Sequence, residues 1–206
     1  MIKYSINISI SLVILILLSC KKNTKASSIS KENVSDSVDT LQISYYPNKK
    51  VKELLLSEHE NHKNVQLYYS ETGSLTGKTT NFNHYPQNHY EYENNRLVHQ
   101  WTEGNIGGCI AITGKEFFWN AKGSLIKETL HTQYGNSCSE KILIHEIKEF
   151  FENTKTIKSI QYTHESYEGS AECPCGIWKN LDPAGKIISQ QEFPECKNNV
   201  NCEEAE

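Results

Sequence analysis

Cysteine is the residue type in this chain whose number and spacing could support chemistry. The chain has 206 residues and seven cysteines, one of which, Cys20, stands alone near the amino terminus. The other six are Cys109, Cys138, Cys173, Cys175, Cys196 and Cys202. Such residues form disulfides, bind zinc as thiolates or act as nucleophiles. Structural zinc sites usually take cysteines about two to four residues apart, so the single residue between Cys173 and Cys175 fits zinc poorly.

Other catalytic signatures are absent from the sequence. There is no G-x-S-x-G elbow, phosphate-binding loop or dinucleotide fingerprint. The segments 145–149 and 164–168 begin like a zinc-protease helix, but neither has the second histidine four residues on. The pairs His59/His62 and His84/His89 could form a weak metal site, and we interpret them as solvated histidines. We therefore expect no catalytic residue, no metal and no cofactor.

The formal net charge is −4 and Arg96 is the single arginine. A nucleic-acid-binding domain would show a basic patch, so we expect no nucleic-acid partner.

The first nineteen residues have the pattern of a signal peptide. Lys3 supplies the positive start, and residues 12–18 hold no polar side chain. This apolar run is shorter than the roughly 20 residues that a membrane-spanning helix needs. We therefore predict that residues 1–19 are removed.

The junction Leu17-Leu18-Ser19-Cys20 resembles the lipobox of bacterial lipoproteins. The resemblance implies a lipid on the Cys20 thiol, cleavage before Cys20 and acylation of the new amino terminus, which together anchor a protein firmly to a membrane. Residues 20–40 are rich in Ser, Lys, Asn and Asp, a composition typical of a flexible tether.

Export changes how the six remaining cysteines are interpreted. An even number of cysteines in an oxidising compartment favours disulfides, and six cysteines allow fifteen pairings. Cys173 and Cys175 are too close for an easy bond to each other, so Cys196 and Cys202 are their nearest candidate partners. Cys109 then remains for Cys138.

A sequence pattern recurs along the chain at intervals of about 23 to 33 residues. It consists of a bulky, mostly aromatic pair, a polar turn and an alternating apolar stretch. The six copies are Tyr45–Val51, Tyr68–Leu75, Tyr90–Leu97, Phe117–Leu125, Phe150–Ile157 and Ile177–Ile187.

Each copy predicts a β-hairpin, because aromatic and β-branched residues favour strands and Asn, Gly, Pro and Asp favour turns. Gly73, Gly123 and Gly185 lie where a positive φ is expected. Residues 146–162 are predicted to form strands rather than a helix, because residues 153–156 interrupt the run and residues 156–162 alternate with period two.

This repeated pattern, over residues 44–193, resembles the MORN-repeat variant, a family frequent in bacterial lipoproteins and often given a toxin–antitoxin label. The glycine of that family is missing in the first, third and fifth copies, and the longer intervals imply insertions. The resemblance implies an all-β fold of stacked antiparallel hairpins in a single-layer or curled meander sheet. We expect disulfides to staple this sheet toward its carboxyl end.

The expected organisation is a signal peptide (1–19), a lipidated tether (20–40), a hairpin-repeat domain (41–195) and an acidic tail with Cys202 (196–206). The first aromatic of most pairs is expected in the core: Tyr45, Tyr68, Phe117, Phe150 and Trp178. The second could form an exposed binding strip: Tyr46, Tyr69, Phe118 and Phe151.

The sequence favours a non-enzymatic binding or structural protein of the cell envelope. We expect it on the periplasmic face or the cell surface of a bacterial membrane, held by its lipid and binding an unknown protein or glycan. Two alternatives stay open. One is an immunity or antitoxin-like protein that neutralises a secreted toxin, and the other is a metal-binding protein or thiol enzyme that uses the cysteine-rich end.

Overall fold

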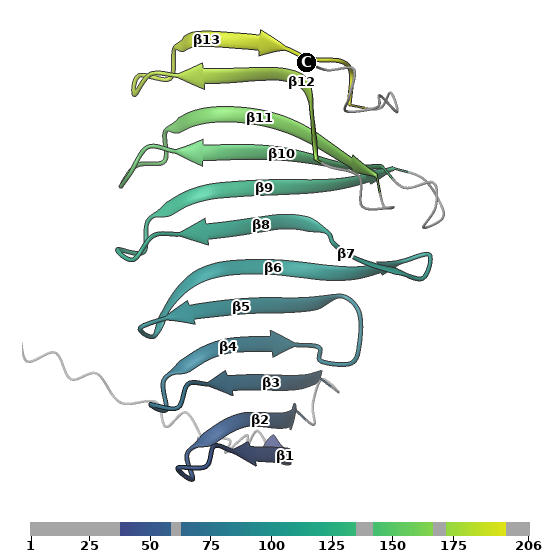
Figure 1. Cartoon of the computed structure of the whole chain (residues 1–206), viewed down its shortest axis with the longest axis vertical. Coiled ribbons are helices and arrows are strands. Elements are labelled where there is room, and N and C mark those ends of the chain that lie inside the picture. Colours follow the sequence, from purple (N-terminus) through teal and green to yellow (C-terminus); the bar gives the residue numbers. More distant parts are fainter. Residues whose placement is uncertain (1–37, 59–62, 135–141, 167–171, 197–206) are drawn as a thin grey trace, which may run out of the picture. The chain divides into compact units, whose positions relative to one another are not determined.

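The computed structural model describes residues 38–58, 63–134, 142–166 and 172–196. These residues form one 13-stranded antiparallel sheet and contain no helix (Figure 1). The strands are β1 (Val38–Tyr45), β2 (Val51–Glu58), β3 (Lys63–Tyr69), β4 (Leu75–Thr80), β5 (Gln87–Glu93), β6 (Arg96–Ile106), β7 (Cys109–Ile112), β8 (Gly114–Trp119), β9 (Leu125–Tyr134), β10 (Ile142–Phe150), β11 (Ile157–Ser166), β12 (Cys173–Leu181) and β13 (Ile187–Glu192). The all-β prediction is confirmed, and β1 begins slightly before the expected start at residue 41.

Strands follow one another through the sheet in chain order, except that β7 lies off this path and pairs with the far half of β6. The six sequence copies coincide with the six hairpins that join β1 to β2, β3 to β4, β5 to β6, β8 to β9, β10 to β11 and β12 to β13. The prediction of stacked hairpins is therefore confirmed. The short strand β7 falls in one of the insertions between copies.

The six hairpins share a register shift just before the turn. The shift lies between Ser44 and Tyr45, Tyr68 and Tyr69, Glu91 and Tyr92, Phe118 and Trp119, Glu149 and Phe150, and Asn180 and Leu181. Such a bulge lets a short turn with one left-handed residue close the hairpin. Gly73, Gly123 and Gly185 have φ of 92°, 84° and 82°, which confirms the prediction for these glycines. Lys49 takes the same place in the first hairpin, with φ 66°.

Neighbouring turns contact one another along the edge of the sheet where all six lie (Figure 1). The Asn48 side chain donates a hydrogen bond to the Glu71 carbonyl oxygen over 3.1 Å. Lys122 Nζ lies 2.8 Å from a carboxylate oxygen of Glu152, and the Ser124 hydroxyl is 2.9 Å from Asn153 Oδ1. These contacts add side-chain bonds between hairpins to the backbone ladder.

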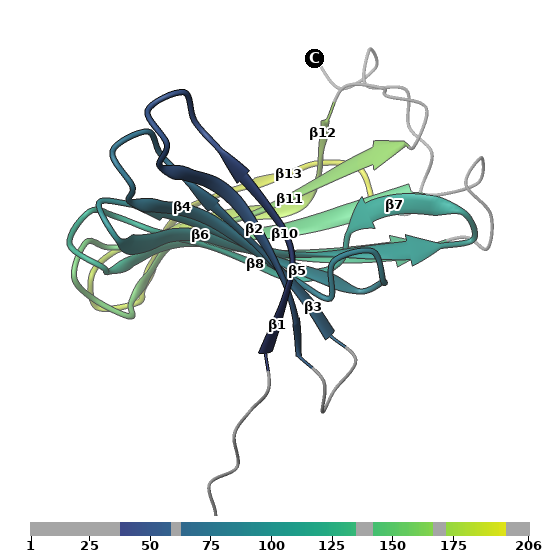
Figure 2. The same cartoon turned by 90° about the horizontal axis from the view of Figure 1, so that it is seen from below.

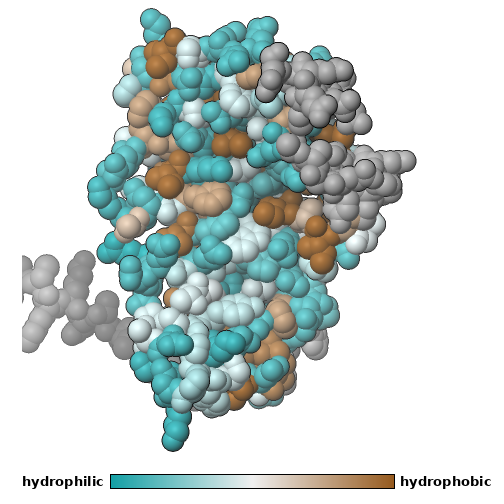
Figure 3. Space-filling model, viewed as in Figure 1, coloured by the Kyte–Doolittle hydropathy of each residue, from teal (hydrophilic) through white to brown (hydrophobic). Residues whose placement is uncertain are grey.

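The sheet is one layer thick and twisted (Figure 2). Because the described residues form no second layer over it, most of its described apolar side chains are only half-buried. The buried apolar residues of the described part are Val65, Cys109, Cys173 and Cys175. On the face shown in Figure 3, apolar side chains form separate patches between polar ones. The prediction of a core position is wrong for Tyr45, which is 57% exposed because it belongs to the edge strand β1.

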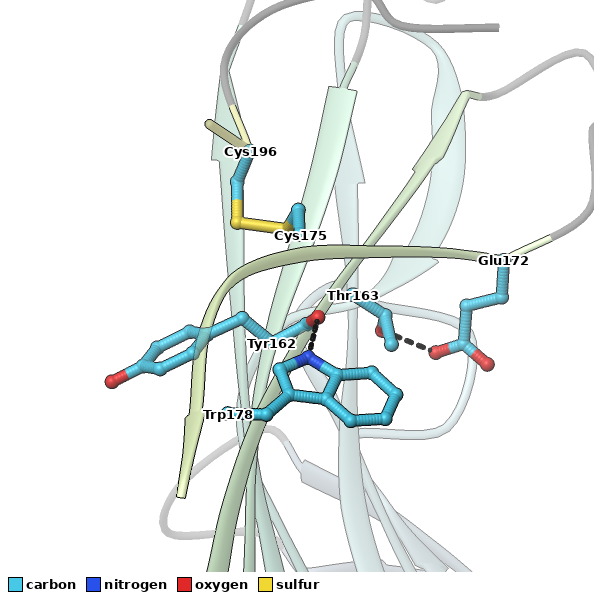
Figure 4. The surroundings of a disulfide bond; sticks show 6 residues. All are labelled: Tyr162, Thr163, Glu172, Cys175, Trp178 and Cys196. Atoms are coloured by element: carbon cyan, nitrogen blue, oxygen red, sulfur yellow. Dashed lines mark hydrogen bonds between the residues drawn. A yellow bond between two sulfur atoms is a disulfide. The ribbon is translucent and has the colours of Figure 1, made fainter. Parts of the chain in front are cut away.

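The chain after β13 folds back onto β12. The Phe193 N–H donates a 2.8 Å hydrogen bond to the Gly176 carbonyl, and the Gly176 N–H donates another to the Pro194 carbonyl. A disulfide joins Cys175 to Cys196, and the nearby Trp178 indole donates to the Tyr162 carbonyl of β11 (Figure 4). The prediction of a staple toward the carboxyl end is therefore confirmed. No helix among the described residues has the length and apolar character to span a membrane.

Candidate functional site

One face of the sheet, from β4 to β11, carries histidine, glutamate and aromatic side chains, and we call it the histidine face. Residues directly opposite each other in antiparallel strands point to the same side. His89 lies opposite Trp101, His99 opposite Phe118, and His131 opposite His145. Its members include Thr79, His89, Glu91, His99, Trp101, Glu103, Glu116, Phe118, Lys127, Thr129, His131, Leu143, His145, Ile147, Thr163 and Glu165.

Four rings of the histidine face form a continuous stack. The ring centroids of His89 and Trp101 are 4.8 Å apart, those of Trp101 and His99 4.4 Å, and those of His99 and Phe118 4.2 Å. Lys127 Nζ lies 4.9 Å from the Phe118 centroid and completes the stack with a cation–π contact. Trp101 is therefore in stacking contact with two imidazoles, those of His89 and His99.

Glu116 is the central charged group of the face. It is 8% exposed, and its two carboxylate oxygens accept hydrogen bonds from His99 Nε2 over 2.7 Å and from His131 Nε2 over 2.9 Å. Burial alone would raise the pKa of Glu116, but the hydrogen bonds and charges of the two histidines outweigh burial and lower that pKa. The carboxylate is therefore ionised and fixed in position at neutral pH.

The next link is a contact between two imidazoles. His131 Nδ1 and His145 Nδ1 are 2.8 Å apart, so one hydrogen bond joins them and one proton occupies the bridge. Burial lowers the pKa of His145, and the neighbouring His131 lowers it further. Uncharged His145 is thus favoured at neutral pH.

The network extends to the rim of the face at both ends. His99 Nδ1 lies 3.2 Å from Glu91 Oε2, and His145 Nε2 lies 3.7 Å from Glu165 Oε2. Three glutamates and three histidines therefore follow one another from β5 to β11, in the order Glu91, His99, Glu116, His131, His145 and Glu165. Carboxylate–imidazole chains of this kind can bind polar ligands, orient a metal-bound imidazole or transfer protons. Within the described ranges, no group of three or more His, Cys, Asp or Glu side chains is arranged to hold a metal.

Two grooves open on this face, one on each side of the ring stack. The first, of about 320 Å³, lies over β3 to β6 and includes Trp101 and His89 in its lining. The second, of about 390 Å³, lies over β7 to β11 and includes Glu116, His131 and His145. Both volumes fall in the range of small-ligand sites. The buried network thus forms part of the floor of the second groove.

The expected aromatic strip is divided between different parts of the sheet. Tyr46 lies in the first turn, and its hydroxyl donates a 2.8 Å hydrogen bond to the carbonyl of Tyr69 at the end of β3. Phe118 belongs to the ring stack on β8, and Phe151 lies in the turn after β10. All four side chains are half-buried. Their role in binding stays a prediction.

The bond between Cys175 and Cys196 is one of the pairings that the sequence favoured. Cys109 and Cys173 are also disulfide-bonded. The expected partners Cys138 and Cys202 lie outside the described residues, as do Cys20 and the pair His59/His62.

Sequence reasoning missed the histidine face. It treated His89 as solvated, whereas the His89 side chain is only 16% exposed and stacks on Trp101. A signal was present, because His89/Glu91, His99/Trp101 and Glu116/Phe118 are each spaced by two residues on predicted strands. That spacing places each pair on one face, and only the register between strands shows that the pairs meet.

No family model, no curated protein and no solved structure matches this chain. The resemblance to the MORN-repeat variant therefore stays a prediction, and the function must be argued from the site itself.

Proposed function

We propose that this protein is a lipid-anchored, non-enzymatic binding module of the bacterial cell envelope, which receives a protein or glycan partner on the histidine face. The observation that carries the proposal is the presence of both grooves on that face, around a preorganised polar network. The signal peptide and the Cys20 lipobox support the location.

Preorganisation supports binding as the role of this face. Glu116 fixes His99 and His131, and the stacked rings restrain Trp101 and Phe118. Side chains that are already ordered lose little conformational entropy when a partner docks. A single-layer sheet also leaves such a face open to a large partner, as expected for a module on a tether.

The cysteines support a binding role over thiol chemistry. All four described cysteines, Cys109, Cys173, Cys175 and Cys196, are disulfide-bonded. A disulfide sulfur is neither a thiolate ligand for zinc nor a thiol nucleophile. These four residues are thus accounted for as structural staples.

The experiment is site-specific photocrosslinking of the full lipoprotein in living cells. A photoreactive phenylalanine analogue replaces Ile110, which is 54% exposed and lines the second groove. The matched control replaces Ile126, which is 37% exposed on β9 and points to the opposite side from Lys127. We expect a discrete adduct from position 110 and none from position 126.

Equal adducts from both positions, or none from position 110, would contradict binding on the histidine face. Turnover of an envelope substrate that is abolished by Glu116→Gln would contradict the non-enzymatic role.

A further inference from the structure

The second groove combines apolar walls with an acidic end. Ile110 and Ile112 of β7 face Leu143 and Ile147 of β10 across it. Glu165 and Glu172 also line the groove, and the lysine in its lining, Lys127, has its Nζ over the Phe118 ring. The side chains in the groove therefore favour a ligand that is both cationic and aliphatic.

Glu116 determines which histidine nitrogens carry protons when neither imidazole has an extra proton. His131 Nε2 faces a carboxylate oxygen at 2.9 Å, so it must be the N–H of that ring. His131 Nδ1 is then a bare acceptor, and His145 Nδ1 must carry the proton in the 2.8 Å bridge between them. His145 Nε2 is consequently left with a free electron pair.

This electron pair lies in the groove beside another acceptor. His145 Nε2 is 3.7 Å from Glu165 Oε2, and both residues line the groove. Two acceptors at this distance repel each other unless a donor binds to both. A primary ammonium group carries three N–H donors and a positive charge, and it can donate to both atoms at once.

We propose that the β7–β11 groove binds a primary ammonium group on an aliphatic stem, with its N–H groups on His145 Nε2 and Glu165 and its methylenes between Ile112 and Leu143. A lysine side chain of a partner protein has this chemistry, and so does a free alkylamine. The inference rests on the proposed binding function and specifies its ligand.

The observations favour an ammonium over a bare metal ion. The described residues offer no set of three metal ligands, and His145 and Glu165 alone would leave most of a coordination shell to water. A metal ion would also make no use of the aliphatic walls, whereas the methylenes of an alkylammonium would bury apolar surface against them.

The test is a titration of the full lipoprotein in detergent micelles, with its isoleucine and leucine methyl groups observed by NMR. The probes are Nα-acetyl-lysine-N-methylamide, n-butylammonium and, as the neutral match, Nα-acetyl-norleucine-N-methylamide. We expect both ammonium probes to shift the methyl signals of Ile112 and Leu143, and the norleucine probe to leave them unchanged.

Glu165→Gln is expected to raise the dissociation constant of the lysine probe at least about tenfold, because it removes one charged partner of the ammonium. Glu192→Gln is the matched control, since Glu192 is an exposed glutamate of β13 that lines neither groove, and it should leave the constant unchanged.

Equal binding of the norleucine probe, or equal losses in the two glutamine variants, would overturn the ammonium assignment. Zinc binding that depends on His145, without ammonium binding, would also overturn it. If the ammonium probes fail while crosslinking from position 110 succeeds, the ligand class is wrong and the binding function stands. Failure of both experiments would remove the proposed function as well.

Discussion

At the scale of the residue, the central feature is a buried carboxylate that holds two histidines. Glu116 is 8% exposed, and both of its oxygens accept imidazole hydrogen bonds. A buried charge costs free energy unless it is paired in this way. The position of Glu116 therefore depends on His99 and His131, and they in turn depend on it.

Replacing Glu116 with glutamine should test this dependence. Glutamine has the same shape, but its amide offers one oxygen where the carboxylate accepted two bonds and places N–H groups against an imidazole N–H. We expect the free energy of unfolding to fall by about 1–3 kcal/mol in urea titrations. The control Glu91→Gln, at the exposed end of the network, should change it by less than about 0.5 kcal/mol. Equal effects would mean that burial does not strengthen these bonds.

The pH dependence of stability follows from the same groups. Because folding lowers the pKa of His145 from its ordinary 6.5, the unfolded chain binds more protons, and stability rises with pH. The His145 contribution is complete above pH 6.5 and is lost as pH falls through the folded pKa. The contribution of Glu116, whose pKa is also lowered, is lost below its ordinary 4.5.

Urea titrations between pH 7.5 and pH 4 should therefore show stability falling first through the histidine range. His145→Gln should flatten the curve in the upper part of this range and leave the carboxylate part in place. An unchanged slope in the variant would show that His145 does not titrate with folding.

The residues of this site could be predicted from sequence only in part. Spacing by two was a signal that could have placed His99 with Trp101 and Glu116 with Phe118 on common faces. It could not show that His99 lies opposite Phe118, because register depends on the turn and bulge of each hairpin. Without register, His89 was interpreted as a solvated histidine, and His99 and His131 were not recognised as parts of a site.

At the scale of the element, the six hairpins share one feature, a bulge, although the β5–β6 turn differs from the others in having positive φ at both Asn94 and Asn95. Each hairpin has a bulge before its turn, and the bulge residue is aromatic in all but the last, where it is Leu181. Sequence analysis aligned Tyr46 and Phe151 with Tyr69, whereas their neighbours Tyr45 and Phe150 occupy the equivalent position. Because these copies contain two adjacent aromatic residues, the sequence alone does not show which of the two occupies the bulge.

Substitutions at the left-handed residue of two equivalent turns should change the free energy of unfolding in opposite directions. Gly123 has φ 84°, and a Cβ there would meet no atom within 4 Å, so only backbone strain opposes a side chain. We expect Gly123→Ala to lower the free energy of unfolding by about 1 kcal/mol. Lys49→Gly, at φ 66° in the first turn, should raise it by roughly 0.5–1 kcal/mol. Chemical denaturation measures both, and changes of the same sign would contradict a common turn geometry.

The insertions between copies were the least predictable elements. The long interval between copies indicated an insertion around Cys109, but it did not indicate a strand. In the structure this insertion forms β7, which pairs with β6 and places Ile112 opposite Glu103. This strand supplies one wall of the second groove. Turn chemistry predicts a hairpin where glycine and asparagine are concentrated, and it does not predict where an inserted hairpin will fold.

At the scale of the whole sheet, the extensive contacts of each described hairpin are with its neighbours in the stack. Stability in such an arrangement is approximately a sum of local and nearest-neighbour contributions, so one end can open while the rest stays folded. Both edge strands are poorly covered, with Leu41 of β1 and Ile188 of β13 more than half exposed. The ends of the sheet therefore depend on local stabilising interactions.

The disulfide between Cys175 and Cys196 provides such a stabilising interaction at the carboxyl end. It closes a segment with a sequence separation of 21, worth about 3 kcal/mol on the chain-entropy account. We expect Cys196→Ser, with Cys175→Ser to avoid a free thiol, to accelerate amide hydrogen exchange in β12 and β13. Exchange in β3 and β4 should stay unchanged, because no disulfide among the described residues connects them to that end. Accelerated exchange throughout the sheet would instead show that the hairpins unfold as one cooperative unit, and that the staple holds the whole sheet rather than its last hairpin.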